Sequence, residues 1–199
     1  MGLFGPSKRE VFERLAYEVQ ARYIKGSFWK NAKVEHRIRG RLVVLDEYTV
    51  STGKSSITYT RIRAPYMPKD HFRFQIYRKG LFSGIAKFFG AQDIQTGDDT
   101  FDAAFIIKSD DDWHVRRLLD EAALRAMIMG QKTFHLHNRK PSFFTTNPLP
   151  HGGGQLEFQV ASVIRDVGRL KELFAIFGMV LDGLHAMGAI TDENLDVDY

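Results

Sequence analysis

Residues 33–63, with the sequence KVEHRIRGRLVVLDEYTVSTGKSSITYTRIR, decide the class of fold. Gly40 interrupts an apolar run between Lys33 and Tyr48, which predicts a bent strand or a tight pair of strands. Thr52-Gly53-Lys54-Ser55 predicts a hairpin turn, and residues 56–63 alternate in the manner of one further strand. Strands joined by such short turns pair antiparallel.

Helices are expected on both sides of this β-rich block. Apolar residues at helical spacing predict an N-terminal helix over about 7–23, a central helix over about 111–129 and a C-terminal helix over about 170–187. Pro65 and Pro68 predict a break in the chain. Further strands are expected at 71–78, 101–108, 132–138 and 155–164. Residues 140–146 are a weaker candidate for one more strand. Because the strands follow one another in hairpins, we predict an α+β fold with a largely antiparallel sheet packed by the three helices.

Length and composition are those of a folded domain. The 199 residues, 44% of them hydrophobic, fit one domain, which we place at 1–190, followed by an acidic flexible tail at 191–199. There is no cysteine, which excludes disulfides and thiolate chemistry. We see no signal-peptide pattern, and no apolar run approaches the roughly 20 residues that cross a bilayer. The expected location is therefore the cytoplasm, with association at the membrane periphery as an alternative.

Charge divides the chain into two halves. Residues 1–90 hold 18 Lys+Arg and 7 Asp+Glu, whereas residues 91–199 hold 10 and 17. Such a division indicates either two halves that attract each other or one basic face that meets an anionic partner.

Arginines on the predicted strands are the candidate anion-binding residues. Arg37, Arg39 and Arg41 alternate along one predicted strand, and Arg61 and Arg63 alternate along another. A stripe of this kind could contact anionic lipid headgroups or nucleic-acid phosphates. The alternative is a solvated sheet face that the acidic half neutralises. The candidate patch comprises Arg37, Arg39, Arg41, Arg61, Arg63 and Arg73.

A short amphipathic helix is predicted at residues 81–89. Its apolar side is suited to a membrane interface, or to a contact that completes the core of the protein. The candidate apolar contact residues are Leu81, Phe82, Ile85, Phe88 and Phe89.

The C-terminal helix has a wide apolar stripe that predicts a helix docked on the core. A seam of a homodimer is the alternative for the same stripe. Gly178, Gly183 and Gly188 would let another element approach this helix closely.

Three motifs resemble known chemistry without completing it. His151-Gly152-Gly153-Gly154 resembles an esterase oxyanion loop, but the chain has no nucleophile elbow. Gly53-Lys54-Ser55 resembles the end of a P-loop, but strands are expected on both sides of it. His135 and His137 have a spacing that can hold zinc, although a third ligand is not indicated. The sequence therefore predicts no catalytic residue, cofactor or metal.

Two blocks are similar to a family of uncharacterised prokaryotic proteins. The first runs from Arg39 to Ile62 and contains the Thr58-Tyr59-Thr60-Arg61 strand. The second contains Thr96-Gly97-Asp98-Asp99-Thr100-Phe101-Asp102. The resemblance spans roughly residues 40–129 and brings no known activity and no functional residues.

These observations favour a non-enzymatic binding or assembly domain in the cytoplasm, with a homodimer through the C-terminal helix as one form of assembly. A peripheral module that binds anionic lipid, or nucleic acid, through the arginine patch is the alternative. An enzyme that uses His135 and His137 is a further one.

Overall fold

The computed structural model describes residues 5–28, 30–51, 53–80, 92–139 and 149–199. The helices are α1 (Lys8–Glu18), α2 (Asp99–Ala104), α3 (Asp112–Leu119), α4 (Ala122–Met129) and α5 (Val167–Ala186). The strands are β1 (Arg22–Ile24), β2 (Lys33–Ile38), β3 (Arg41–Ser51), β4 (Ser56–Tyr66), β5 (Phe74–Arg78), β6 (Gln92–Ile94), β7 (Phe105–Ser109), β8 (His135–Arg139) and β9 (Gly154–Val160).

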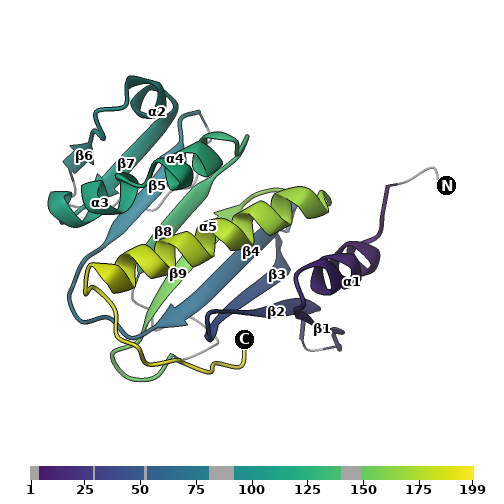
Figure 1. Cartoon of the computed structure of the whole chain (residues 1–199). Coiled ribbons are helices and arrows are strands. Elements are labelled where there is room, and N and C mark those ends of the chain that lie inside the picture. Colours follow the sequence, from purple (N-terminus) through teal and green to yellow (C-terminus); the bar gives the residue numbers. More distant parts are fainter. Residues whose placement is uncertain (1–4, 29, 52, 81–91, 140–148) are drawn as a thin grey trace.

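All of these strands join one sheet, and its pairings are antiparallel. The strand order is β1-β2-β3-β4-β9-β8-β5-β7-β6. Figure 1 shows α5 crossing one face of the sheet, with α1 at the β1 end and α3 and α4 at the other end of the same face. The predicted α+β class with a largely antiparallel sheet is confirmed.

The β2–β3 connection is a tight hairpin. Ile38 lies opposite Arg41, so the loop between the strands consists of Arg39 and Gly40 alone. Both loop residues have positive φ, 50° and 85°, which matches the turn that suits the twist of paired strands. Of the two alternatives for this region, the pair of strands is therefore correct.

The main core lies between the sheet and the helices. Alternate residues of the central strands, among them Leu45, Ile62 and Phe158, are fully buried together with the apolar stripe of α5. A β-carbon on Gly178 would lie 3.0 Å from Ile38, and one on Gly183 would lie 2.7 Å from Leu118. These two glycines therefore let α5 approach β2 and α3, as their positions in the sequence indicated.

Several predicted boundaries are wrong. The N-terminal helix ends at Glu18, because Gln20 takes a φ of 55° and the amide of Ala21 donates to the carbonyl of Ala16, a cap that turns the chain into β1. The predicted central helix is two helices, since Glu121 takes an extended conformation and caps α4.

Two further corrections concern strands. Pro65 does not break the chain; it lies inside β4, opposite Gln155 of β9. The predicted strand at 101–108 begins only at Phe105, because Asp98 accepts hydrogen bonds from the amides of Thr100 and Phe101 and so caps α2. The predicted helix at 81–89 and strand at 140–146 lie outside the described residues.

Residues 191–199 follow α5 and run past the ends of the central strands toward β2 (Figure 1). Their side chains contact the sheet: Leu195 is buried, and the guanidinium of Arg63 of β4 lies over the ring of Tyr199. The division into a domain at 1–190 and a flexible tail stays a prediction.

Candidate functional site

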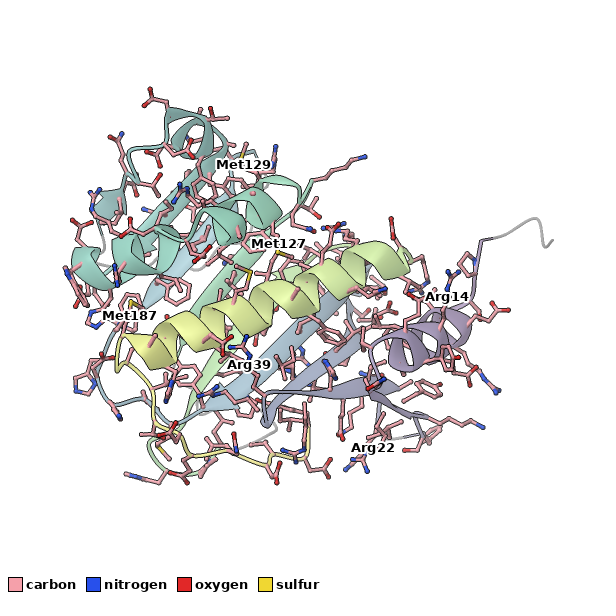
Figure 2. All side chains as sticks on the ribbon, viewed as in Figure 1. Arg14, Arg22, Arg39, Met127, Met129 and Met187 are labelled. Atoms are coloured by element: carbon pink, nitrogen blue, oxygen red, sulfur yellow. The ribbon has the colours of Figure 1, made fainter. Side chains whose placement is uncertain are left out.

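The structure places the six candidate arginines in separate environments. Arg37, Arg39 and Arg41 do not lie along one strand, because the hairpin loop at Arg39 and Gly40 separates β2 from β3. Pairing of Ile38 with Arg41 puts Arg41 on the α5 side of the sheet, where its guanidinium lies 3.9 Å from Asp182 of α5. Arg39 is directed toward α5 (Figure 2) and pairs with the same carboxylate.

The other four arginines are also paired with carboxylates. Arg73 precedes β5, and its Nε donates to Asp110 Oδ2 over 2.8 Å. The remaining three, Arg37, Arg61 and Arg63, lie on the sheet face opposite α5. The strand register sets Arg61 opposite Asp46, whereas Arg37 lies opposite Leu42 and pairs with Asp196 of the segment after α5. We call this side the charged face; its residues are Lys33, Glu35, Arg37, Asp46, Arg61, Arg63, His137 and Glu157.

Asp46 of β3 is the centre of the charged face. Its carboxylate accepts from Arg61 at both oxygens, over 2.9 and 2.6 Å, and from Arg63 over 2.7 Å. Burial alone would lower the pKa of Arg61, but the hydrogen bonds to Asp46, together with the negative charges of Asp46 and Glu157, raise that pKa. At Arg63, which is only 5% exposed, burial prevails and lowers the pKa. Asp46 is therefore the carboxylate shared by two cations that the sheet withdraws from water.

Aromatic rings complete this cluster. The Arg61 guanidinium lies 4.5 Å from the centre of the Tyr48 ring, and that of Arg63 lies 3.9 Å from the centre of the Tyr199 ring. The hydroxyl of Tyr199 donates to Gln155 Oε1 over 2.8 Å. Burial raises the pKa of that hydroxyl well above its usual range.

His135 and His137 alternate on β8 and therefore share the charged side of the sheet, with ring centres 4.7 Å apart. Nε2 of His137 lies 3.8 Å from Glu157 Oε1. His151 lies before β9, in the loop that the sequence likened to an oxyanion loop. Over the described ranges, no three His, Cys, Asp or Glu side chains come together in a way that could hold a metal ion.

A second surface lies on the helical side of the molecule. A hollow of about 530 Å³ separates α3 and α4 from the last turns of α5, and a neighbouring hollow of about 470 Å³ continues it along α3. We call the two together the α3–α5 groove. Its apolar lining comprises Leu118, Leu124, Met179, Ala186 and Met187, and its charged rim comprises Arg116, Arg117, Asp120, Glu121 and Asp182.

Trp113 stands at the end of this groove and is 62% exposed. Its position is fixed by His114, whose ring meets the indole edge-on at 4.9 Å and stacks on Phe72 at 5.0 Å. His114 Nδ1 lies 2.7 Å from Asp111 Oδ2, and its Nε2 lies 3.6 Å from Asp70. A large apolar ring is thus exposed to water beside a hollow that apolar and charged side chains line together.

Sequence reasoning missed both Asp46 and Trp113. Asp46 gives no local signal, because its role depends on a register between β3 and β4 that places it opposite Arg61. The exposure of Trp113 could have been predicted, because within the predicted central helix it lies off the apolar stripe formed by Val115, Leu118 and Leu119. The candidate residues Leu81, Phe82, Ile85, Phe88 and Phe89 lie outside the described part of the chain.

These features define a class of architecture, a single antiparallel sheet with helices on one face and a charged network on the other. No family model matches the sequence, and no curated protein matches it. The fold is similar to that in the crystal structure of the mycobacterial trehalose monomycolate transport factor A, TtfA, with a TM-score of 0.51. The match covers 89% of this chain and 96% of that chain at 13% identity, a similarity of fold alone. Among the helices in the described ranges, none combines the length and apolar character needed to cross a membrane.

Proposed function

We propose that this chain is a non-enzymatic assembly domain of the cytoplasm that forms a homodimer through the α3–α5 groove. The observation that carries the proposal is the exposed Trp113 beside a hollow of the same molecule whose lining includes Ala186 and Met187. Tryptophan is the side chain that most often dominates the energy of a protein interface when it enters a pocket.

The groove is complementary to a second copy of itself. In a two-fold dimer the same patch faces its own image, so the Trp113 of each copy can enter the hollow of the other. Cations and carboxylates border the groove together: Arg116 and Arg117 on α3, Asp120 and Glu121 after it, and Asp182 on α5. An antiparallel arrangement brings opposite charges together at both ends.

Two further features support an interface here. The methionines of the lining, Met179 and Met187, have flexible side chains that adapt to an inserted ring. The contacts that hold His114 also restrain Trp113, which lowers the entropy lost on association. The apolar stripe of α5, by contrast, is buried in the core of its own chain, so the dimer uses the outer side of that helix.

The charged face supports a non-enzymatic role. Arg61 and Arg63 are both held on Asp46, with aromatic rings over their guanidinium groups. Cations arranged in this way stabilise the sheet and a packed chain segment, which is the work of a structural network.

Sedimentation velocity over a range of concentrations tests the dimer. We expect wild-type protein to increase in mass with concentration, and Trp113→Ala to raise the dimer dissociation constant by more than about tenfold. Tyr17→Ala is the matched control, because this ring is 87% exposed on α1, away from the groove. A protein that stays monomeric at millimolar concentration, or equal effects of the two substitutions, would contradict the proposal.

Binding of anionic lipid or nucleic acid through the arginine patch is the alternative function. Its ligand would have to replace the carboxylates that now pair with the exposed side chains of Arg37 and Arg39. Co-sedimentation with phosphatidylserine vesicles separates the two functions. Salt-sensitive binding that is lost in Arg37→Gln/Arg39→Gln, with no self-association, would favour the alternative.

A further inference from the structure

The charged face already holds an acidic segment of its own chain. Residues 195–199, Leu-Asp-Val-Asp-Tyr, lie against it, and alternate side chains of this segment pair with cations. Asp196 pairs with Arg37 of β2. Asp198 pairs with Lys30 over 2.6 Å and with Lys33 over 3.2 Å.

The aromatic end of the segment fits a defined position. The Tyr199 ring lies under the guanidinium of Arg63, and its hydroxyl donates to Gln155. Lys33 Nζ donates to the carbonyl oxygen of Tyr199 over 2.8 Å. At the other end, Leu195 is buried close to Gly153, where a β-carbon would lie 3.6 Å from Leu195 Cδ1.

The contacts that hold the two aspartates are of the kind that can exchange. Asp196, Asp198, Lys30 and Arg37 all have well-exposed side chains, and ion pairs in water contribute little to stability. Specificity comes instead from the spacing of the charges and from the position under Arg63. A different segment with the same chemistry could therefore take the place of this one.

We propose that the charged face is a binding site for an acidic protein segment with two aspartates in alternate positions and a following aromatic residue, and that residues 195–199 occupy it within the chain. A partner with such a segment binds by displacing them. This site is on the opposite side of the sheet from the α3–α5 groove. The proposal that it binds an acidic segment therefore does not depend on whether the chain forms a dimer.

The test uses the full chain with its own segment weakened. Asp196→Asn/Asp198→Asn removes the three ion pairs that the aspartates make and leaves Leu195 and Tyr199 in place. The probe is a fluorescent peptide with the sequence of residues 191–199, Thr-Asp-Glu-Asn-Leu-Asp-Val-Asp-Tyr, and binding is followed by polarisation. We expect it to bind the double variant about tenfold more tightly than wild type, because loss of about 1.4 kcal/mol from the competing segment corresponds to that factor.

Two matched comparisons make the result specific. Adding Lys30→Gln/Arg37→Gln to the weakened chain should reduce peptide affinity about tenfold, whereas Lys69→Gln/Lys132→Gln, at exposed lysines elsewhere, removes the same charge with little effect. A peptide with Asn in place of both alternate aspartates should bind at least tenfold more weakly.

Three results would overturn the proposal. The first is that the peptide does not bind to the weakened chain although circular dichroism shows this chain to be folded. The second is that the Asn peptide binds as tightly as the Asp peptide. The third is that Lys30→Gln/Arg37→Gln and Lys69→Gln/Lys132→Gln reduce peptide affinity equally.

Discussion

Asp46 shows how much one residue can determine on a sheet. It is buried and receives hydrogen bonds from two arginines, one of which is also buried. Two cations on adjacent positions of one face would repel each other without a carboxylate between them. The basic pattern at 61 and 63 in the sequence is therefore compatible with a folded sheet only because the neighbouring strand brings Asp46 to it.

Removal of Asp46 should be costly. Asp46→Ala leaves Arg61 and Arg63 without their carboxylate, and we expect it to lower the free energy of unfolding by about 3 kcal/mol. Urea denaturation measures this. Asp93→Ala is the control, because Asp93 is well exposed in its pair with Lys108 and should change stability by less than about 0.5 kcal/mol. Similar effects of the two substitutions would contradict the central role of Asp46.

Tyr66 gives a pH-dependent prediction. Burial raises the pKa of its hydroxyl to about 12, from an ordinary value of 10. Above pH 10 the unfolded chain ionises first, so this contribution to stability is full below pH 10 and is lost as pH rises to about 12. The loss should approach about 2–3 kcal/mol relative to Tyr66→Phe. The difference in the free energy of unfolding between the two proteins, measured by denaturation at several alkaline pH values, should therefore change by that amount between pH 10 and pH 12; a constant difference would be evidence against it.

Two glycines of α5, Gly178 and Gly183, are the points at which this helix contacts β2 and α3 closely. Gly183 lets α5 pass close to Leu118 of α3, and the same contact forms the floor of the α3–α5 groove. The geometry of that contact therefore determines both the stability of the helical layer and the shape of the groove.

A double-mutant cycle tests this contact. Gly183→Ala should destabilise by about 1–3 kcal/mol, since its methyl group would collide with Leu118 Cδ1 at 2.7 Å. Leu118→Val removes that atom, so the two substitutions together should cost clearly less than the sum of their separate effects. Strictly additive free energies of unfolding would show that the helices do not meet as described.

The limits of sequence reasoning are also clearest at the level of elements. Apolar spacing located α1, α5 and the region of α3 and α4, because these signals are local, but it missed α2, and Gly40 left a bent strand and a pair of strands as alternatives for β2–β3. It could not show that Glu121 divides the central helix, nor that Pro65 fits within β4. Strand register was out of reach in the same way, and so was the pairing of each candidate arginine with a carboxylate distant in sequence, such as Arg39 with Asp182.

At the scale of the whole molecule, the sheet separates two surfaces. The helices α1, α3, α4 and α5 lie on one side (Figure 1). The α3–α5 groove lies among these helices, and residues 195–199 contact the charged face on the other side. The basic and acidic halves of the chain meet within the fold, since Arg37 and Arg39 of the first half pair with Asp196 and Asp182 of the second. A domain with two independent surfaces is suited to assembly.

Fluorescence of Trp113 tests the proposed assembly most directly. In a Trp29→Phe background Trp113 is the one tryptophan left, since the chain has two. Its indole is exposed in the single chain and would be buried in the groove of a second copy. We predict that its emission shifts to shorter wavelength as concentration rises, over the range in which sedimentation shows the dimer forming. A dimer whose Trp113 emission stays that of an indole in water, or no dimer at any concentration, would contradict assembly through the α3–α5 groove.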